Sequence, residues 1–560
     1  MNWVADILRR YPEMAVFLVL GLGALIGRIK LGSVSLGTVT GALFAGLMVG
    51  QLNIPVAPSA KAILYLLFLV GNGYSIGPQF FRSLRGEGVR YLALAVVQCT
   101  AGLLGAVMMA KFLQLDPGMA AGLLSGALTQ SPAIGTASET INALPLPQEQ
   151  RALLIAHVAI GDALTYLFGT AGVIWFCSLI APKLLRINLV AEAKKLEDQL
   201  HVDGARSGLT SMYTPFALRA YVVGTTGAAG RKVSDFEASY PGKRFYVEQV
   251  RRVDKIVNEP EDLVLARGDV VAVSGRRATV MEIGAIIGEE ADDKELLDMP
   301  GNVQAVTVSN PAVIGKPLED LAQWRESRGV YLRRIKRIGE DIPTLPGTVL
   351  NRGDVVELLG TESAIRRFAG LVGMSHKSGP GTDLAAVCFA VVAGCLIGVP
   401  FVVVHGFRLS LGTAVGALVM GIVLGWLHSV RPTFGHLPEA ASSLLISLGL
   451  AAFVGMNGMQ AGTHFIEAFK AQGVPLLLGG VAVTLFPLFC SALFGRYVLK
   501  LNPILLLGAC AGAQTVTAAM AEVQDKSGSR TPVLGYTVPY AIGNILLTIW
   551  GSVIVTIMAS

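Results

Sequence analysis

The chain has 560 residues, of which 52% are hydrophobic and 15% are charged, and its formal net charge is +6. A soluble domain carries about 25% charged residues, so most of this chain is not soluble, and its high apolar content excludes intrinsic disorder. Lys and Arg form short clusters beside apolar runs instead of one basic face, which excludes nucleic acid as a partner.

Ten apolar stretches are long enough to cross a membrane, which takes about 17–25 residues. They lie near 12–29, 33–52, 60–80, 88–113 and 152–181 in the first half, and near 383–404, 409–427, 441–460, 473–498 and 532–558 in the second. These stretches predict a polytopic α-helical membrane protein in contact with lipid.

Two further runs, 117–140 and 503–523, are rich in Gly, Ala, Ser and Thr and have a polar middle. The middle is Thr129-Gln130-Ser131-Pro132 in the first run and Gln514-Thr515-Val516-Thr517 in the second. Proline and hydroxyl groups at membrane depth are tolerated where protein or a water-filled cavity satisfies the backbone. Each run is therefore predicted to be either a helix broken in its middle or a re-entrant hairpin.

The two apolar halves resemble each other, which indicates an internal duplication. Motifs recur in the same order: Gly37-Thr38 with Gly412-Thr413, Asn72-Gly73 with Asn457-Gly458, Gln130-Ser131 with Gln514-Thr515, and Gly161-Asp162 with Gly543-Asn544. If each polar run is a hairpin, each half holds five crossings. An odd number of crossings inverts the second half relative to the first.

The basic residues test this arrangement, because Lys and Arg are more frequent in cytoplasmic loops. With the N-terminus outside, most of them fall in inner loops, including Arg82, Lys183 and Arg496. Arg9 and Arg10 do not follow this rule, because they would lie outside. The charges favour two inverted repeats, each of five crossings and one hairpin. The chain is expected in a bacterial cytoplasmic membrane. Both termini are expected outside, and the middle of the chain is expected in the cytoplasm.

The middle of the chain has a different character: its charge rises, Val alternates with polar residues and no run is long enough to cross. The segment Arg267-Gly268-Asp269-Val270-Val271 is echoed by Arg352-Gly353-Asp354-Val355-Val356, and both are typical of a turn in a β-hairpin. We expect a soluble tandem of two α+β modules. The predicted division is a membrane repeat at 1–187, a linker helix at 188–204, modules at 205–290 and 291–376, and a second membrane repeat at 377–560.

The layout and these motifs resemble the aspartate–alanine exchanger family over nearly the whole chain. The segment Gly71-Asn72-Gly73-Tyr74-Ser75-Ile76-Gly77-Pro78-Gln79-Phe80-Phe81 looks like the third-helix signature of that family. The two Arg-Gly-Asp-Val-Val segments look like its central modules, which are similar to the C-terminal subdomain (TrkA-C) of potassium-uptake regulators. The resemblance implies a secondary transporter that exchanges L-aspartate for L-alanine. It also implies an elevator-like motion and a homodimer.

The two polar runs form the candidate substrate site. A helix that breaks at the bilayer midplane exposes an N-terminus that binds anions, and amide and hydroxyl groups add hydrogen bonds without fixed charge. Inversion brings one tip from each side, so the tips are expected to meet. The candidate residues are Thr129, Gln130, Ser131, Pro132, Gln514, Thr515 and Thr517; alternatively, these small residues only pack helices.

Asp162 is an acid within a crossing, where an ionisable group has a functional role by default. It either binds an ammonium group or a coupling cation, or it is a buried carboxyl, and Asn544 is its expected mate in the second repeat. His157 either shifts the titration of Asp162 or packs. The remaining candidates are Tyr74, Ser75 and Asn457 as cavity lining, and Arg82 as either an attractor of anions or a cytoplasmic anchor.

No cofactor or metal is expected. The six cysteines fall in apolar segments without metal-ligand spacing, and the central modules lack a dinucleotide fingerprint. An enzyme is not expected either, because the sequence has no nucleophile elbow and no paired acids. The modules either bind a small ligand that regulates transport or serve as a structural or dimerisation element.

Two other functions stay open. A proton- or sodium-coupled antiporter of small cations or carboxylates, regulated by the modules, usually needs strong acids at the broken helix, where this chain has Thr-Gln-Ser. A membrane sensor on a transporter-like scaffold would not need two polar runs in lipid. An exchange assay over amino acids and dicarboxylates distinguishes these functions.

Overall fold

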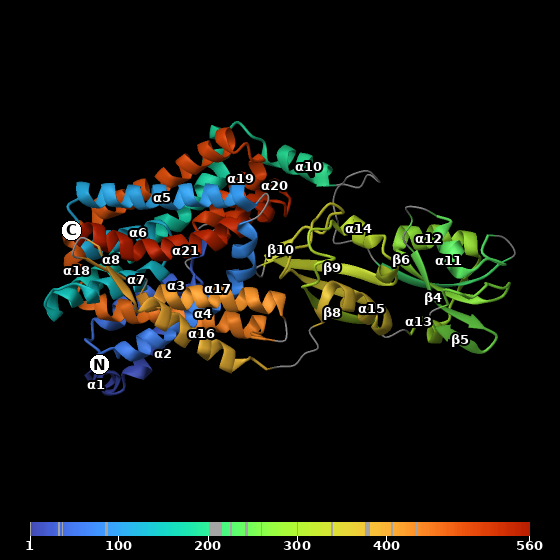
Figure 1. The fold of residues 1–560 in the computed structure, drawn as a ribbon, viewed down its shortest axis with the longest axis horizontal. Coiled ribbons are helices and arrows are strands. Elements are labelled where there is room, and N and C mark those ends of the chain that lie inside the picture. Colours follow the sequence, from blue (N-terminus) through green and yellow to red (C-terminus); the bar gives the residue numbers. More distant parts are fainter. Residues whose placement is uncertain are drawn as a thin grey trace. The chain divides into compact units, whose positions relative to one another are not determined.

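The computed structural model describes residues 2–31, 34–35, 37–84, 88–200, 216–224, 227–240, 243, 245–258, 260–298, 301–337, 340–375, 381–404, 407–410, 412–431 and 434–559. They form two compact units (Figure 1). A helical unit comprises Met1–Glu197 and Ser378–Ser560 with the short segment Lys336–Ile342, and an α+β unit comprises Asp198–Ile335 and Pro343–Lys377. The predicted boundaries at 204–205 and 376–377 lie outside the described residues.

The helices of the first half lie where the apolar runs predict them. They are α2 (Pro12–Ile26), α3 (Thr38–Gly50), α4 (Pro58–Ser83), α5 (Gly88–Phe112), α6 (Pro117–Ala127), α7 (Pro132–Ala143) and α8 (Gln148–Trp175), after a short α1 (Asn2–Arg10). A π-helical turn η1 (Phe176–Ile180) and α9 (Ala181–Leu184) prolong α8, and α10 (Leu189–Leu200) occupies the predicted linker. Strands β1 (Lys30–Leu31) and β2 (Val34–Ser35) pair between α2 and α3.

The second half repeats this order. It contains α16 (Leu384–Gly398), the pair β13 (Phe401–Val404) and β14 (Phe407–Ser410), α17 (Gly412–Val430), α18 (Glu439–Leu493), the π-helical turn η3 (Phe494–Val498), α19 (Pro503–Ala513), α20 (Thr517–Ser527) and α21 (Pro532–Ala559). Within the described ranges, six helices are long and apolar enough to cross a membrane: α4, α5, α8, α17, α18 and α21. Helix α16 is shorter than predicted because β13 takes up the end of its apolar run, and α3 is shorter because β2 lies at the start of its run. Helix α2 ends at Ile26, before its predicted end and before β1.

Helix α18 occupies two predicted crossings, 441–460 and 473–498. If its 55 residues formed a straight helix, it would be about 83 Å long, whereas the hydrocarbon core is about 30 Å thick. The first part of α18 packs on α3 and α4 through Gly455 and Gly449, and the second part packs on α5 and α8 through Gly479 and Gly480. The chain therefore turns back within α18, at the end of the bundle where Figure 1 labels it.

The register of α4 and α18 shows that the two halves are inverted. Gly71 of α4 lies against Ser442 of α18, whereas Leu64 of α4 lies against Gly449. Residue numbers rise along one helix as they fall along the other, so the two helices are antiparallel. Both carry the recurring Asn-Gly motif. Equivalent helices of the two halves therefore run in opposite directions, as the sequence predicted.

Each polar run forms a re-entrant hairpin. Gly118 and Gly126 of α6 lie against Leu154 and Asp162 of α8, in that order, so α6 and α8 are parallel. Helix α7, which connects them, must therefore bring the chain back to the side from which α6 started. Helices α19 and α21 are parallel in the same way. Of the two arrangements that the sequence left open, the structure has the hairpin.

The two halves interlock through glycine-rich helix faces. Helix α3 of the first half packs along α18, where Gly46 lies against the backbone of Gly455. Helix α17 of the second half packs along α4, where Gly425 lies against the backbone of Tyr74. Small residues allow such backbones to approach closely, so each half supplies the packing partner of the other.

The α+β unit contains two modules of the same topology. The first sheet has the order β5-β4-β6-β3-β7 and the second the order β10-β9-β11-β8-β12. The strands are β3 (Phe216–Val222), β4 (Phe245–Arg252), β5 (Lys255–Asn258), β6 (Val270–Arg276), β7 (Glu290–Ala291), β8 (Gly301–Val308), β9 (Val330–Arg337), β10 (Glu340–Ile342), β11 (Val355–Thr361) and β12 (Gly373–Ser375). The main helices are α11 (Val233–Ala238) and α12 (Arg277–Ile287) in the first module, and α14 (Leu318–Ala322) and α15 (Glu362–Val372) in the second. The predicted tandem is confirmed.

The Arg-Gly-Asp segments form turns, but the prediction that they lead hairpins is wrong. Gly268 has a φ of +87°, and the Asp269 carboxylate accepts the N–H of Ala266 at 2.8 Å, which closes the turn. The next strand, β6, pairs with β3 and β4 instead of its neighbour β5. Burial alone would raise the pKa of Asp269, but the bonds from Arg252 and the Ala266 N–H outweigh it and lower the pKa. The stabilisation from this turn is therefore lost as the pH falls through that lowered pKa.

Arg328 of the second module joins the two modules. Its guanidinium donates to both oxygens of Glu237 at 2.7 and 2.9 Å and to Glu261 at 3.0 Å, and both acids belong to the first module. The Arg328 side chain is only 13% exposed. Replacing one partner of a buried ion pair destabilises by about 3–5 kcal/mol. We expect Arg328→Ala to speed hydrogen exchange of β4 and β9 in the full-length protein.

The control for Arg328→Ala is Arg366→Ala on α15. Arg366 pairs with Glu362 on the same helix, and both side chains are at least 70% exposed, so its loss is expected to leave exchange in β4 and β9 unchanged. Equal exchange in wild type and Arg328→Ala would show that this ion-pair cluster does not hold the modules together.

Candidate functional site

The two hairpins share the same backbone conformation. Side chains of Asp116 and Asn502 cap the N-termini of α6 and α19, and each helix then begins with proline. At the tips, Thr129 and Thr515 have φ angles of +56° and +57°. A β-branched residue rarely adopts this left-handed conformation, and such strain concentrates at functional sites. Thr129 and Thr515 are therefore equivalent positions of the two repeats.

This equivalence corrects the sequence alignment of the tips. The sequence paired Gln130 with Gln514, but Gln130 follows the left-handed residue of its hairpin and Gln514 precedes the other. The residue equivalent to Gln130 is thus Val516. The prediction of matched glutamines is wrong, because matching two short polar motifs by composition shifts one hairpin by two residues relative to the other.

The two tips are in contact, as predicted. Thr129 Oγ1 donates a hydrogen bond to the carbonyl oxygen of Gln514 at 2.5 Å, and Thr515 Oγ1 donates to Gln130 Oε1 at 3.2 Å. Gln130 Nε2 donates to Thr548 Oγ1 of α21 at 3.0 Å. Thr129, Gln130 and Gln514 are buried, so the tips form a polar centre without fixed charge.

Asp162 lies on α8 directly beside the first hairpin. Its Oδ1 accepts a hydrogen bond from Ser125 of α6 at 2.7 Å. Its Oδ2 is buried and has no hydrogen-bond partner among the described residues. His157 does not contact this carboxyl; its Nδ1 lies 2.8 Å from Oδ2 of Asp116, the cap of α6. The suggestion that His157 tunes Asp162 is not supported by this contact.

The expected pairing of Asp162 with Asn544 is wrong. Gly126 of α6 lies against the carbonyl oxygen of Asp162, and its equivalent Gly512 lies against that of Tyr536. Tyr536 therefore occupies the place of Asp162 in the second repeat. Helix α21 carries Gly535, Gly543 and Gly551 at intervals of eight residues, so a sequence match can slide by two turns and keep the glycine face.

Asn544 nevertheless joins the polar centre by another route. Its Oδ1 accepts a hydrogen bond from Asn72 Nδ2 of α4 at 3.1 Å, and its carbonyl oxygen accepts from Thr548 Oγ1 at 2.6 Å. Asn72 and Thr548 were not among the predicted site residues. The recurring Asn72-Gly73 motif could have identified Asn72 as a site residue, whereas no sequence pattern pointed to Thr548.

Gln514 also has an unused polar atom. Its Nε2 donates to the carbonyl oxygen of Thr484 at 3.4 Å, but its buried Oε1 has no hydrogen-bond partner in the described part of the chain. Leaving a buried acceptor unpaired costs about 1–3 kcal/mol. Such atoms at the meeting point of two hairpins are suited to bind the donors of a substrate.

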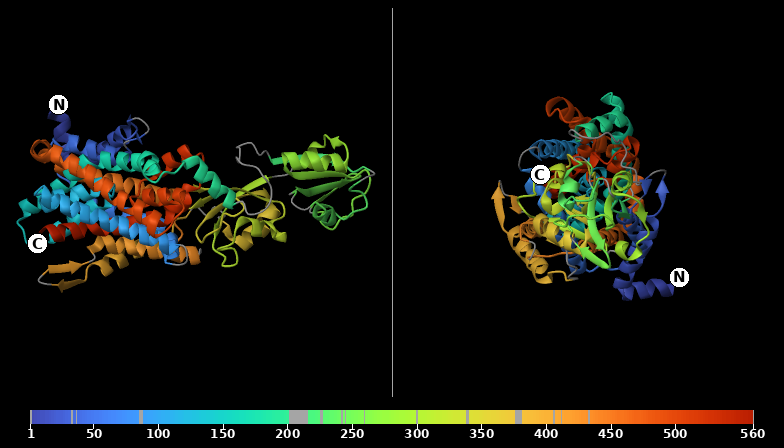
Figure 2. Two further views of the ribbon diagram at one scale, coloured as in Figure 1. Left: turned by 90° about the horizontal axis from the view of Figure 1, so that it is seen from above. Right: turned by 90° about the vertical axis from the view of Figure 1, so that its right-hand side faces the viewer.

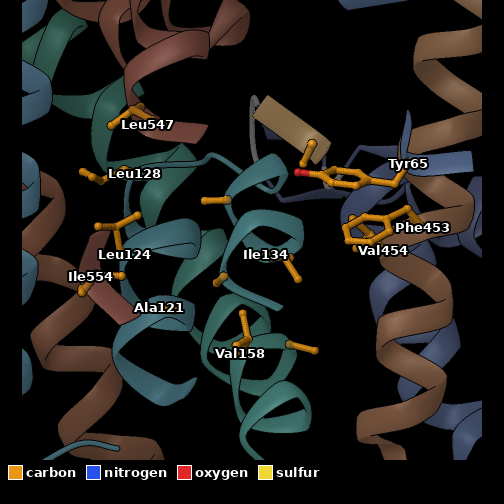
Figure 3. Close-up of a cluster of buried hydrophobic side chains, with 14 of the residues drawn as sticks. Tyr65, Ala121, Leu124, Leu128, Ile134, Val158, Phe453, Val454, Leu547 and Ile554 are labelled. Carbon is orange, nitrogen blue, oxygen red and sulfur yellow. The ribbon is translucent and has the colours of Figure 1, made fainter. Parts of the chain in front are cut away.

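A cavity of about 1040 Å³ lies beside the first hairpin. It is lined by parts of α4, α7, α8, α17 and α18, including Tyr65, Gly135 and Phe453. The Tyr65 ring stacks on Phe453 with 4.2 Å between centroids, and its hydroxyl donates to the carbonyl oxygen of Pro132 at 2.6 Å. Figure 3 shows this hydroxyl pointing towards the hairpin. The cavity therefore lies next to the start of α7, directly after the tip of the first hairpin.

Other predicted residues lie away from the tips. Tyr74 accepts a hydrogen bond from the N–H of Leu437, and Ser75 bonds to Ser442, so both join α4 to the start of α18. Arg82, near the end of α4, is ten residues beyond Asn72, which corresponds to about 15 Å along a helix. These three residues are not brought together with the tips.

The remaining candidates are close to the site in different roles. Thr517, at the start of α20, lies 2.8 Å from the Tyr536 hydroxyl. Ser131 precedes α7 and makes no side-chain cap, and Pro132 contributes its carbonyl to Tyr65. Asn457 accepts from Lys61 at 3.2 Å, next to the cavity. No cluster of metal-ligating side chains occurs among the residues that the structure describes.

This architecture defines a class of protein. Two inverted halves, each with a re-entrant hairpin, and polar tips that meet in the middle are features of secondary transporters. The membrane parts match a family model described as a predicted permease membrane region (Asp-Al_Ex) over residues 15–182 and 386–556, and residues 303–373 match the TrkA-C domain. The chain belongs to the Asp-Al_Ex family, as its motifs predicted.

Relatives of similar length are named uncharacterized transporters. An uncharacterized transporter of Bradyrhizobium diazoefficiens is 42% identical over 525 residues, covering 92% of this chain and 100% of the relative. Those of Bordetella bronchiseptica and Shewanella oneidensis are 40% and 37% identical, and cover 99% and 100% of this chain and 98% and 100% of their own. No solved structure matches the chain. The protein is a multi-pass membrane transporter.

Proposed function

We propose that this transporter exchanges L-aspartate for L-alanine across the cytoplasmic membrane. The observation that carries the proposal is the meeting of the two hairpin tips, where Thr129, Gln130 and Thr515 supply neutral hydrogen-bonding groups. Gln514 Oε1 and Asp162 Oδ2, both without partners among the described residues, can accept hydrogen bonds from a substrate ammonium group. The amide and hydroxyl groups of the tips include donors that suit a carboxylate. An amino acid carries both groups.

The grouping of the helices supports an elevator-type exchange. Helices α2, α3, α4, α16, α17 and the first part of α18 pack mainly with one another, and α5 to α8, the second part of α18 and α19 to α21 form a second group. Figure 2 gives two further views of these helices. Polar bonds connect the groups, including Asn72 with Asn544 and Tyr65 with Pro132. Such bonds can be exchanged as one group slides along the other.

The proposal also includes the membrane topology of the chain and its assembly. The basic residues of the predicted inner loops support central modules in the cytoplasm, with both termini outside. We also propose a homodimer, as the family resemblance implies. The predicted boundary at 187 lies just before α10, whereas the boundary at 290 falls within β7, which pairs with β3 of the first sheet. The second sheet begins at β8, so the first module extends past residue 290.

The test is counterflow in proteoliposomes that contain the purified protein. Vesicles loaded with unlabelled aspartate or alanine are expected to accumulate labelled aspartate several-fold over empty vesicles. An exchanger needs internal substrate, because it carries one substrate molecule out for each molecule that it brings in. Vesicles loaded with a cationic amino acid are the control. If neither aspartate nor alanine inside the vesicles stimulates uptake, the exchange proposal is wrong.

Asp162 favours a second candidate, a proton-coupled transporter of the same substrates. A buried carboxyl with one unpaired oxygen can take up and release a proton during the cycle. The same vesicles distinguish the candidates when they are empty and a pH gradient is imposed. Uptake that requires the gradient and is lost in Asp162→Asn indicates coupling, whereas an exchanger needs only the internal substrate.

A further inference from the structure

We propose that the cavity beside the first hairpin is a binding site for dicarboxylates, in which Lys61 and Arg151 each receive one carboxylate. The inference rests on the proposed function, because it identifies this cavity as the route by which acidic substrates reach the tips. It adds a charged site, which selects substrates, to the neutral tips.

Lys61 lies on α4 and lines the cavity. Its ammonium group donates to two neutral amide oxygens of α18, Asn457 Oδ1 at 3.2 Å and Gln460 Oε1 at 2.8 Å. No carboxylate pairs with it among the described residues. The two amides fix the direction of the ammonium group without neutralising it, and an ammonium group has a third N–H to donate.

Arg151 is a second cation in the same lining. It lies near the start of α8, and its Nη1 donates to the carbonyl oxygen of Asn142 at 2.8 Å. Its buried Nε has no hydrogen-bond partner within the described ranges, and no acid pairs with its guanidinium there. A guanidinium with unused N–H groups is suited to a carboxylate, which it can bind with two parallel hydrogen bonds.

The acids that line the cavity do not neutralise these cations. Glu139 of α7 accepts hydrogen bonds from the N–H and hydroxyl of Thr413 at 2.7 and 2.9 Å, and from the N–H of Ala414 at 3.3 Å. It therefore caps the N-terminus of α17. Glu149, in the first turn of α8, is exposed. The cavity keeps two unpaired cations, and its His464 adds no negative charge.

The size and position of the cavity match a small dicarboxylate. Its volume of about 1040 Å³ slightly exceeds that of typical ligand pockets, which span about 300–1,000 Å³, so a four-carbon diacid enters with water. Tyr65 lines the cavity and bonds to the first residue of α7. A bound substrate therefore lies against the hairpin that carries Thr129 and Gln130. Two cations favour two carboxylates over one.

The test measures ligand affinity from the thermal unfolding of the full-length protein in detergent, with aspartate, succinate and alanine as the ligands. We expect Lys61→Gln and Arg151→Gln each to weaken binding of both dicarboxylates by at least about tenfold, because each removes a charge-assisted hydrogen bond. Affinity for alanine is expected to stay within about twofold of wild type. Lys61→Arg, which keeps the positive charge, is expected to bind dicarboxylates as the wild type does.

The matched control is Lys111→Gln at the exposed end of α5, which is expected to change nothing. Lys61→Arg and Arg151→Gln keep the test valid if Lys61→Gln does not fold. Equal aspartate affinity in wild type and both glutamine variants would overturn this inference and leave the exchange proposal intact. Equal loss of alanine and dicarboxylate binding would also overturn it. If wild type binds no dicarboxylate, the inference fails, and counterflow with the same preparation decides the proposed function separately.

Discussion

Replacing Gln514 by Leu is expected to reduce exchange by at least about tenfold while leaving the unfolding midpoint of the protein unchanged. Gln514 Oε1 is buried without a partner among the described residues, and its Nε2 makes one long bond to Thr484. Removing an unpaired buried acceptor is nearly neutral for stability or slightly favourable. If this oxygen receives the substrate, only transport loses a hydrogen bond, which is worth about tenfold or more inside a dry site.

The matched variant is Gln130→Leu. Gln130 uses both ends of its amide, accepting from Thr515 and donating to Thr548, so its loss leaves buried partners unpaired and is expected to lower the unfolding midpoint as well. Counterflow and thermal unfolding of the same preparations separate the two effects. If Gln514→Leu exchanges substrate at the wild-type rate, the second tip does not bind the substrate through Gln514.

Replacing Gly122 by Val is expected to prevent accumulation of the folded protein. A β-carbon at Gly122 of α6 would lie 2.5 Å from the carbonyl oxygen of Val158 and 2.7 Å from the Cα atom of Gly161 on α8. These are backbone atoms, so the helices must separate. Overpacking typically costs about 1–3 kcal/mol, and separating two helices that carry the hairpin and Asp162 is expected to exceed that range.

Gly21→Val on α2 is the control, because nothing lies within 4 Å of a β-carbon at Gly21. Size-exclusion chromatography of detergent extracts compares the two variants at equal expression. A monodisperse Gly122→Val protein with wild-type stability would mean that α6 and α8 do not pack as described.

The sequence predicted those features that depend on composition and on the number of crossings. Apolar runs located the helices, and the polar middles at Thr129 and Gln514 located the hairpins, because a polar segment in lipid needs a special environment. The number of crossings predicted the inversion that the α4–α18 register shows. The central tandem followed from a repeated turn motif, although the strand that follows each turn pairs with non-adjacent strands.

The sequence did not predict which side chains meet. Asp162 was matched to Asn544 because glycines recur every eight residues on α21, and a period of that kind cannot fix a register. Tyr74 and Ser75 were selected for their polarity, but they serve the junction of α4 with α18. Lys61 was not among the candidates, because a lone cation in the first turn of a membrane helix is typical of a membrane boundary. Its amide partners lie almost four hundred residues later in the chain.

The interlocking of the two halves has a consequence for biosynthesis. During synthesis, α3 and α4 leave the ribosome before their partners α18 and α17 exist, and the two central modules are made in between. The glycine faces of α3 and α4 therefore contact lipid in the bilayer until the last third of the chain, which contains their partners, is inserted. The membrane packing is therefore complete only when the final helices are inserted, and a nascent chain truncated after the modules lacks the packing partners of α3 and α4.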